Sequence, residues 1–241
     1  MLRDAAPRPD ARLVLRPPGL CVLCRSWCAD GLCPACLQRF APPKPRCARC
    51  GRVMAVPLEA CGGCLREPPA WDRAITMADY DGPWPALIAG FKFRQQVELA
   101  SALAAGLANA VSRNQAPRPD LLVPVPLSSV RLRERGFNQA WEIARRLGHR
   151  LGVTTSSDRL QRVRDTAHQI GKPRDERERN LRDAFWVDSR RRASVVGQRL
   201  ALIDDVLTTG ATAQAAALSL RRAGAATVDL WVLARTPLGE N

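Results

Sequence analysis

The chain has 241 residues and a formal net charge of +14 at pH 7. Charged residues make up 25% of it and hydrophobic residues 46%, which is ordinary for a globular protein. No apolar run approaches the roughly 20 residues that span a bilayer, and the N-terminal segment lacks the apolar stretch of a secretory signal. We therefore expect a cytoplasmic protein without membrane insertion, with a disordered, basic N-terminus over residues 1–18.

The cysteines are confined to the first quarter of the chain, and all nine precede residue 65. Two sulfurs three residues apart on a tight turn can reach one tetrahedral ion, and two such turns complete a thiolate cage. We therefore predict a double zinc-ribbon domain over residues 19–70, with two structural Zn²⁺ sites that supply much of its folding energy. Eight of the cysteines form the required C-x-x-C pairs: Cys21/Cys24, Cys33/Cys36, Cys47/Cys50 and Cys61/Cys64.

Other interpretations of the cysteines are weaker. A disulfide framework is disfavoured because no secretory signal is present, and four pairs in succession favour metal over a redox motif. The pairs can be grouped sequentially or interleaved, and the spacing does not decide between the two. Cys28 is left over; it could replace Cys24 as a ligand or be a small buried residue, and we favour burial.

After residue 70 the pattern alternates between helices and strands. Residues 71–80 are expected to form a short extended passage into the main domain, and residues 156–180 a mobile loop or hairpin. Helical spacing of apolar residues occurs within 84–111, 140–151 and 212–222, and short apolar runs that indicate strands occur at 121–125, 185–187, 200–203 and 227–233. This alternation predicts an α/β domain with a mainly parallel sheet flanked by helices.

Arginine supplies almost all of the positive charge, because only three of the 37 basic side chains are lysines. Residues 131–199 carry a local excess of nine positive charges. Arginine suits bidentate phosphate recognition and base stacking, so this stretch predicts a phosphorylated sugar, a nucleotide or a nucleic acid as ligand. A solvated basic surface or a genomic bias towards arginine would produce the same composition, and the sequence leaves these alternatives open.

The segment 202–212 carries the most specific signal for chemistry. An apolar strand is followed by Asp204 and Asp205, and then by a turn that opens a helix and contains Thr208, Thr209, Gly210, Ala211 and Thr212. Backbone N–H groups at a helix N-terminus attract a phosphate, and the two acids can accept hydrogen bonds from ribose hydroxyls or accompany a bound Mg²⁺. A ribose 5-phosphate unit therefore fits this loop, whereas the phosphate-binding G-x-x-x-x-G-K-[ST] motif of P-loop proteins is absent.

This loop resembles the phosphoribosyl pyrophosphate (PRPP) motif of type I phosphoribosyltransferases. Further segments, in the same order, resemble the ComF competence-protein family, in which a zinc ribbon precedes such a domain. The residues that carry this resemblance are Lys92, the Arg135–Gln139 string with Gly136, Phe137 and Asn138, and the positions Gln139, Gln169, Arg177 and Asn180. The resemblance implies a type I phosphoribosyltransferase-like domain over residues 71–241.

The same resemblance assigns roles to residues around the loop. Asp204 and Asp205, the candidate catalytic residues, would bind ribose hydroxyls, and Thr208–Thr212 the 5-phosphate. The turn at Val125 and Pro126 would meet pyrophosphate, with Arg131, Arg133 or Arg135 nearby to neutralise it. Residues 164–180 would be a flexible cover. Mg²⁺ is the expected companion of PRPP, and no pocket for a nucleobase acceptor is recognisable in the sequence.

Two hypotheses follow for function. In the first, the chain binds PRPP or another ligand that contains ribose 5-phosphate, and acts in natural transformation by handling internalised single-stranded DNA, with a DNA-uptake helicase as a possible partner. In the second, it is an active Mg²⁺-dependent phosphoribosyltransferase of nucleotide metabolism or salvage. Phe137, Trp141 and Trp186 lie near arginines and could stack bases, although we expect Phe137 and Trp186 in the core.

Overall fold

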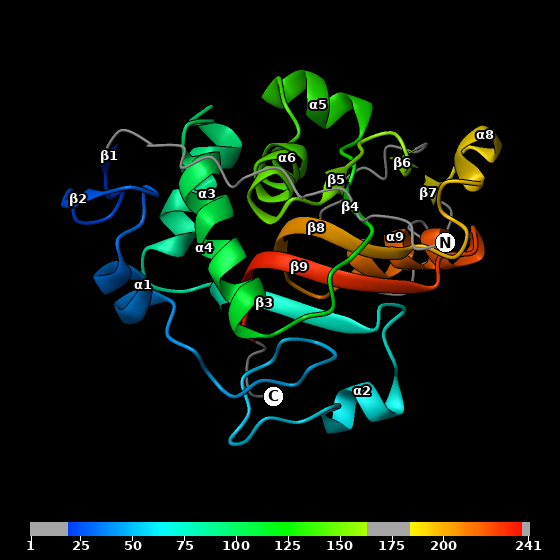
Figure 1. The fold of residues 1–241 in the computed structure, drawn as a ribbon, viewed down its shortest axis with the longest axis horizontal. Helices are drawn as coiled ribbons and strands as arrows, with labels where there is room; N and C mark the ends of the chain where they lie inside the picture. The colour runs from blue at the N-terminus through cyan, green and yellow to red at the C-terminus, as the bar shows by residue number, and fades with distance from the viewer. Residues whose placement is uncertain (1–18, 163–183, 238–241) are drawn as a thin grey trace, which may run out of the picture.

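The computed structural model describes residues 19–162 and 184–237. The predicted disordered N-terminus over 1–18 and the predicted cover over 164–180 lie outside these ranges, together with the family positions Gln169, Arg177 and Asn180. A five-stranded sheet forms the centre of the molecule, with helices on both faces (Figure 1). The predicted α/β class with a mainly parallel, helix-flanked sheet is confirmed.

All strand pairs of the central sheet are parallel, in the order β3-β9-β8-β4-β5. Parallel strands must be buried on both faces, and these are rich in Val, Leu, Ile and Ala. Their bounds are β3 Arg73–Asp79, β4 Leu121–Pro124, β5 Thr154–Thr155, β8 Arg199–Leu207 and β9 Thr227–Arg235. Because the strands are parallel, the loops after β4 and β8 leave the sheet at the same edge, which is where ligands bind in folds of this kind.

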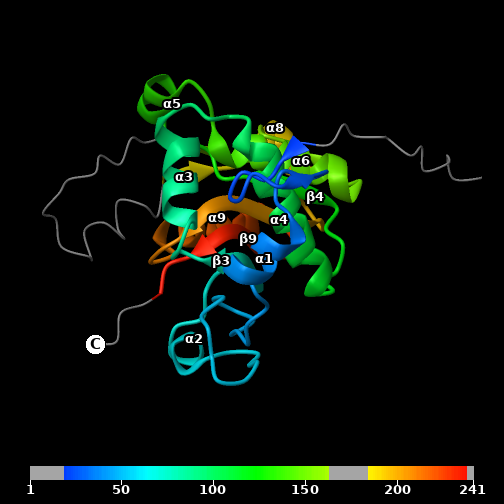
Figure 2. The same ribbon diagram turned by 90° about the vertical axis from the view of Figure 1, so that its left-hand side faces the viewer.

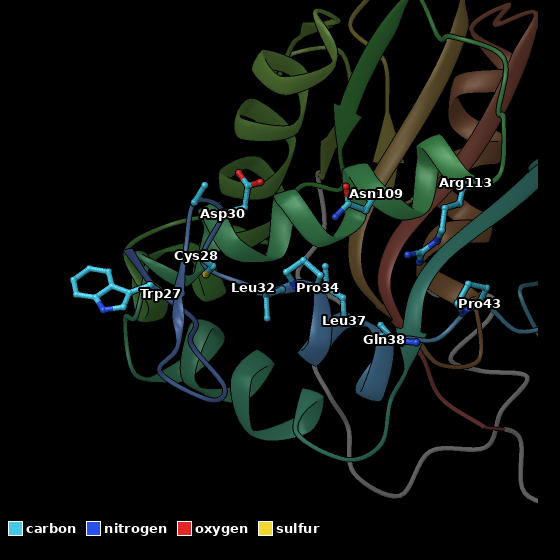
Figure 3. Close-up of a pocket in the computed structure, with 12 residues that line it drawn as sticks. Trp27, Cys28, Asp30, Leu32, Pro34, Leu37, Gln38, Pro43, Asn109 and Arg113 are labelled. Atoms are coloured by element: carbon cyan, nitrogen blue, oxygen red, sulfur yellow. The ribbon is translucent and has the colours of Figure 1, made fainter. Parts of the chain in front are cut away.

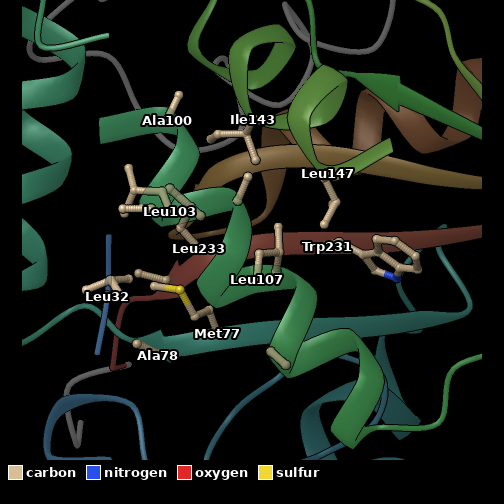
Figure 4. Close-up of a cluster of buried hydrophobic side chains, with 14 of the residues drawn as sticks. Leu32, Met77, Ala78, Ala100, Leu103, Leu107, Ile143, Leu147, Trp231 and Leu233 are labelled. Carbon is tan, nitrogen blue, oxygen red and sulfur yellow. The ribbon is translucent and has the colours of Figure 1, made fainter. Parts of the chain in front are cut away.

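Helices cover the two faces of the sheet unequally. Helices α3 (Trp84–Phe93), α4 (Leu99–Arg113) and α6 (Gln139–Leu151) cover one face, and α9 (Ala211–Arg222) covers the other (Figures 1 and 2). On the first face, α4 packs against β3 and β9, and α6 against β4 and β8; the residues shown include Leu103, Leu107, Ile143, Leu147 and Trp231 (Figure 4). Successive residues of each strand point to opposite faces of the sheet, so they contribute alternately to a hydrophobic core on each face.

Three features of the main domain differ from the sequence expectation. The passage at 71–80 is a full strand, β3, at the edge of the sheet. The strand expected over 200–203 continues through both acids to Leu207, because β9 pairs with it along this length. Helix α5 (Ser129–Arg135) was not expected from the sequence. It buries no residue, so its apolar side chains do not form the buried face by which a helix is recognised.

Short elements complete the main domain. Strands β6 (Gln161–Arg162) and β7 (Phe185–Trp186) form a separate antiparallel pair, and α8 (Ser189–Arg192) follows β7. The prediction of a strand at 185–187 is therefore confirmed, although β7 ends one residue earlier. Trp186, expected in the core, is 43% exposed, because it points outward from this two-stranded pair.

The cysteine-rich segments pack onto two different parts of the main domain. The first contains β1 (Gly19–Leu20), β2 (Trp27–Cys28) and α1 (Pro34–Phe40), and its Leu32 joins the core beside α4 (Figure 4). The second contains α2 (Gly62–Arg66) and lies along the edge strand β3, where the Ala74 N–H donates to the Ala48 carbonyl at 2.8 Å. The second segment thus covers a sheet edge that would otherwise be open.

Candidate functional site

The two acids of the predicted loop lie near the end of β8, where successive side chains point to opposite faces. Asp205 points towards α3 and forms an ion pair with Lys92, with Oδ1 2.7 Å from Nζ. Both side chains are largely buried, at 5% and 19% exposure. The second oxygen of Asp205, Oδ2, is buried and has no hydrogen-bond partner among the described residues. An orphaned buried acceptor is costly, so a donor on a ligand would relieve it.

Asp204 lies in a different electrostatic environment. Burial, together with the charge of Asp205, raises the pKa of Asp204 to about 7, although the Asp205 N–H, Lys92 and Arg162 act in the opposite direction. Its Oδ1 accepts from the Asp205 N–H at 2.8 Å. Near neutral pH a bound cation or a set of ribose hydroxyls would therefore favour its ionised form.

The raised pKa of Asp204 predicts a pH-dependent stability. The ordinary pKa of Asp is about 3.9, so the folded protein retains a proton between about pH 4 and pH 7 that the unfolded chain releases. The contribution of Asp204 to the free energy of unfolding therefore falls as pH rises through this window. We expect Asp204→Asn to remove this contribution and to raise stability at pH 8 by an amount of the order of 1 kcal/mol, or about 2–4 °C in Tm. Tm values of both proteins at pH 5 and pH 8 check this, and an unchanged pH dependence in the variant would contradict it.

The loop between β8 and α9 has the backbone needed for phosphate. Gly210 is left-handed, with φ 86°, and it caps α9 without a side-chain hydrogen bond. The threonine hydroxyl of Thr209 accepts from the Ala211 N–H at 3.4 Å, while Thr208 and Thr209 are exposed. The N–H groups of the first turn of this 12-residue helix, which include that of Thr212, therefore face the loop with the positive end of the helix dipole.

The predicted pyrophosphate side is built by the segment after β4. The Val125 N–H donates to the Ile203 carbonyl at 2.9 Å, which holds the turn at Val125 and Pro126 against β8. Asn138 caps α6 and also donates from Nδ2 to the Val125 carbonyl at 3.1 Å. The Asn of the family string therefore fixes the position of this turn relative to α6.

Helix α5 carries the three arginines that were predicted to neutralise pyrophosphate. Burial lowers the pKa of Arg135, while the charges of Asp205 and Asp204 act in the opposite direction, so this guanidinium lies in the field of the acid pair. Arg131 is half-buried one turn earlier, whereas Arg133 is exposed on the opposite side. The structure thus places Arg135 in the field of the acids, with Arg131 close to Arg135, and leaves Arg133 in solvent.

The aromatic residues near the site differ in their burial. Phe137 packs against Phe91, with ring centroids 5.6 Å apart, and is a core residue as expected. Gly136 ends α5 in the left-handed conformation, and Gln139 is buried at the start of α6. Phe93, which follows Lys92 in the segment that carries the family resemblance, is 68% exposed, and the Arg135 guanidinium lies 4.9 Å from its ring centre. The role of Lys92 was missed, because its contact with Asp205 is non-local.

Each cysteine segment brings four thiols together. Within each group, the sulfur atoms lie within 4.8 Å of one another, as a metal ion requires; the groups are Cys21, Cys24, Cys33 and Cys36 (the first tetrad) and Cys47, Cys50, Cys61 and Cys64 (the second tetrad). The structure therefore selects the sequential grouping over the interleaved one. Cys28 belongs to neither tetrad and is half-buried, so it is less enclosed than expected.

The thiol environments fit a bound cation. A hydrogen bond from Ser26 lowers the pKa of Cys24 to about 6, whereas burial and the neighbouring thiols raise the pKa of Cys36 above its ordinary value. Four thiolates cannot ionise side by side without a compensating charge, which a divalent ion supplies. Each tetrad offers four sulfur ligands, which would fill the tetrahedral coordination of a zinc ion and leave no position for a substrate. Sites of this composition are structural rather than catalytic.

A cavity of about 600 Å³ lies beside the first tetrad, between α1 and α4. Leu32, Leu37 and Asn109 are among the residues that line it, and Trp27 projects outward at its rim (Figure 3). Trp27 is 74% exposed. No residue of the loop after β8 lines this cavity. The cavity is therefore not part of the candidate ribose-phosphate site.

Comparison with known proteins connects these features. The chain is 40% identical over 230 residues to the DNA utilization protein YhgH of Salmonella typhi, covering 92% of this chain and 100% of that protein. It is 32% identical over 222 residues to competence protein F of Haemophilus influenzae, covering 89% and 96%. No protein-family model matches.

Among solved structures, the chain is similar to glutamine phosphoribosylpyrophosphate amidotransferase from B. subtilis, with 20% identity and a TM-score of 0.40 over 60% of this chain and 30% of that one. Among the described residues, no helix has both the length and the apolar character to cross a membrane.

A parallel sheet, an acid pair at the end of β8 and a Thr-Gly loop at the start of α9 define a phosphoribosyltransferase-like domain, here joined to two cysteine tetrads that can hold metal. The chain belongs to the family of competence protein F and YhgH, and the resemblance to ComF proteins is confirmed.

Proposed function

We propose that the chain binds PRPP, or another ligand that contains ribose 5-phosphate, at the loop between β8 and α9. One observation carries this proposal: a buried carboxylate, Asp205, has one oxygen paired with Lys92 and the other without a partner among the described residues, and it lies five residues before Gly210, which caps α9 without a side-chain hydrogen bond. Vicinal hydroxyls suit the acids and a phosphate suits the N–H groups, so one sugar phosphate satisfies both.

The proposal also includes two divalent metals, each with its own set of residues. Zn²⁺ would be held by the two tetrads, in a cysteine-rich domain over residues 19–70. Mg²⁺ would accompany PRPP, with Asp204 and Asp205 as the oxygen ligands or acceptors nearest to it, and would neutralise part of the pyrophosphate charge. Arg131 and Arg135 would contribute further positive charge on the α5 side.

At the level of process, we propose a role in handling internalised single-stranded DNA in natural transformation. The names of the relatives, competence protein F and DNA utilization protein, support this role, as does the net charge of +14 of this chain. Exposed aromatic side chains next to arginines, such as Phe93 beside Arg135, offer stacking surfaces for bases. A DNA-uptake helicase is the proposed protein partner.

The alternative is an active phosphoribosyltransferase. An exposed aromatic ring at Phe93, close to the acid pair, could receive a base, although no enclosed acceptor pocket is described there. The zinc-loaded protein with Mg²⁺ and PRPP should then release pyrophosphate in the presence of a suitable base. Calorimetric titration with PRPP, run beside a pyrophosphate assay over a panel of bases, separates the two: binding without turnover supports the first proposal, and absence of binding contradicts both.

DNA binding through α5 leads to a prediction about salt. Replacing Arg131, Arg133 and Arg135 together with glutamine should weaken single-stranded DNA binding at low salt about 10- to 100-fold. It should also reduce the slope of log affinity against log salt by about 2, because each phosphate contact to a single strand contributes about 0.7. Fluorescence anisotropy with a labelled oligonucleotide at several salt concentrations measures both quantities.

The matched control removes the same charge from α8, where Arg190, Arg191 and Arg192 are all exposed. This variant should bind the oligonucleotide more tightly than the α5 variant. An equal loss in both would show a diffuse basic surface, and salt-insensitive or absent binding by the unmodified protein would overturn the DNA-binding role.

A further inference from the structure

Two backbone carbonyls of the second tetrad are held by side chains from the main domain. They belong to the turn Cys47–Cys50, which supplies two of the four ligand sulfurs of this tetrad. The Arg49 carbonyl accepts from the indole Nε1 of Trp71 at 2.6 Å, and the Cys50 carbonyl accepts from Nε of Arg235 at 3.2 Å. The geometry of the metal-binding turn is therefore connected to two specific side chains outside it.

Arg235 also holds the loop that follows β8. It is the last residue of β9, opposite Leu207 in the register of the sheet, and only 6% of it is exposed. Its Nη1 donates to the Leu207 carbonyl at 2.8 Å, to the Thr208 carbonyl and to the Thr236 carbonyl at 3.1 Å. One buried guanidinium thus binds the metal-binding turn with one edge and the start of the phosphate loop with the other.

Trp71 reaches the same loop from its other end. Its side chain is buried, at 4% exposure, and a Cβ atom at Gly210 would lie only 3.1 Å from its Cη2 atom. The indole therefore packs directly on the backbone of Gly210, the cap of α9. Arg235 and Trp71 together fix both ends of the segment 207–210, which supplies the proposed phosphate contacts.

A cavity of about 480 Å³ lies between the turn and the loop, and Cys50, Cys64, Trp71, Gly210 and Arg235 are among the residues that line it. Of the side chains that line this cavity, Trp71 and Arg235 both donate hydrogen bonds to the metal-binding turn and contact the segment 207–210. The first tetrad, in contrast, packs through Gly31 and Leu32 against α4, where Gly31 contacts Ala102.

We propose that the second tetrad controls the affinity of the phosphate loop through Arg235 and Trp71, which act as positioning residues. Metal in this tetrad orders the turn Cys47–Cys50, and the turn holds the two side chains that hold residues 207–210. By thermodynamic reciprocity, a sugar phosphate on the loop also retains metal in the second tetrad and has no such effect on the first. This inference rests on the proposed function, since it names PRPP as the ligand of the loop.

Arg235→Gln tests this in the full chain loaded with zinc, because it removes the guanidinium while keeping a buried polar side chain. Arg150→Gln is the matched control: it makes the same charge change and breaks the 2.7 Å ion pair to Asp30, which ties α6 to the first cysteine segment. Trp71→Phe is the second test variant, as it keeps the aromatic packing and loses the hydrogen bond to Arg49. Zinc content, PRPP affinity by calorimetry and the rate of zinc release to a chelating indicator are measured for each.

The unmodified protein should release zinc in two phases, of which PRPP with Mg²⁺ slows one. Arg235→Gln should retain two zinc ions but bind PRPP about tenfold more weakly, and PRPP should no longer slow either phase; Trp71→Phe should shift both quantities in the same direction. Arg150→Gln should behave as the unmodified protein does. PRPP affinity within twofold of the unmodified value in both test variants, with the protection of zinc retained, would overturn the inference.

Failure of the ligand assignment gives a different result. If the unmodified protein does not bind PRPP at all, the proposed function fails, and the coupling is then measured without ligand by amide hydrogen exchange of residues 207–210. Chelation of zinc should speed exchange of these amides in the unmodified protein, and Arg235→Gln should show the faster exchange with zinc still bound. Unchanged exchange in both experiments would overturn the coupling independently of the ligand.

Discussion

Asp205→Asn should weaken PRPP binding by about 30- to 150-fold, the loss expected when a hydrogen bond to a charged group worth about 2–3 kcal/mol is removed. Asp205 offers one oxygen to Lys92, and its other oxygen, Oδ2, has no partner in the part of the chain that the structure describes. An amide keeps only one acceptor and carries no negative charge, so it no longer offers a charged acceptor to both the ammonium and a ribose hydroxyl. Calorimetric titration with PRPP and Mg²⁺ measures the change.

The controls for this variant separate ligand binding from stability. Asp205→Asn also leaves the buried ammonium of Lys92 without its counter-charge, which is destabilising in itself. Thermal unfolding of the single variant and of Lys92→Met/Asp205→Asn quantifies that part. Asp229→Asn alters a half-buried carboxylate on the neighbouring strand, where burial raises the pKa of Asp229 to about 6. It should leave PRPP affinity unchanged, and an equal loss in both variants would contradict the role of Asp205.

Removal of metal should have the second large effect. We expect chelation to lower Tm by about 10 °C or more and to release two zinc ions per chain, because structural zinc contributes several kcal/mol and a domain of this size shifts by about 2–4 °C per kcal/mol. Cys21 and Cys47 are fully buried, and Cys21, Leu32 and Leu37 are part of the core that also contains α4. Loss of the first tetrad would therefore loosen the main domain as well as its own segment. Metal analysis and differential scanning calorimetry give the two numbers.

Single cysteine variants make this prediction specific. Cys36→Ser should lose one zinc ion, and Cys28→Ser should retain both, since Cys28 belongs to neither tetrad. One zinc ion or none in the unmodified protein would refute the two-site assignment. Loss of zinc from Cys28→Ser would instead show that Cys28 takes part in ligation.

Local signals in the sequence were sufficient for much of this account. The C-x-x-C spacing predicts the tetrads because both sulfurs of a pair lie on one turn, independently of the rest of the chain. The run from Leu202 to Thr212 predicts strand, loop and helix in order, because the apolar strand, the glycine and the helix start are each encoded nearby. Gly224 illustrates the same point: it follows Ala223, the C-cap of α9, with φ 100°, in the left-handed region where glycine commonly ends a helix.

Non-local pairings could not be predicted in the same way. Residues 73–79 form a sheet strand only because β9, more than 150 residues later, pairs with them. The Lys92–Asp205 ion pair joins positions 113 residues apart, and Arg235 carries no sequence signal that would connect it with Cys50. Helix α5 was missed because Val130 and Leu132 are exposed, so its apolar residues show no buried face. Its N-cap, Ser128, was the one local signal available.

Amide hydrogen exchange of the zinc-loaded protein, with and without saturating PRPP and Mg²⁺, tests the central claim most directly. The N–H groups of the loop and of the first turn of α9, residues 208–213, should become protected on binding, while those of α4 should not change. Protection confined to another region, or binding of PRPP without protection of these amides, would contradict the assignment of the loop between β8 and α9 as the ribose-phosphate site.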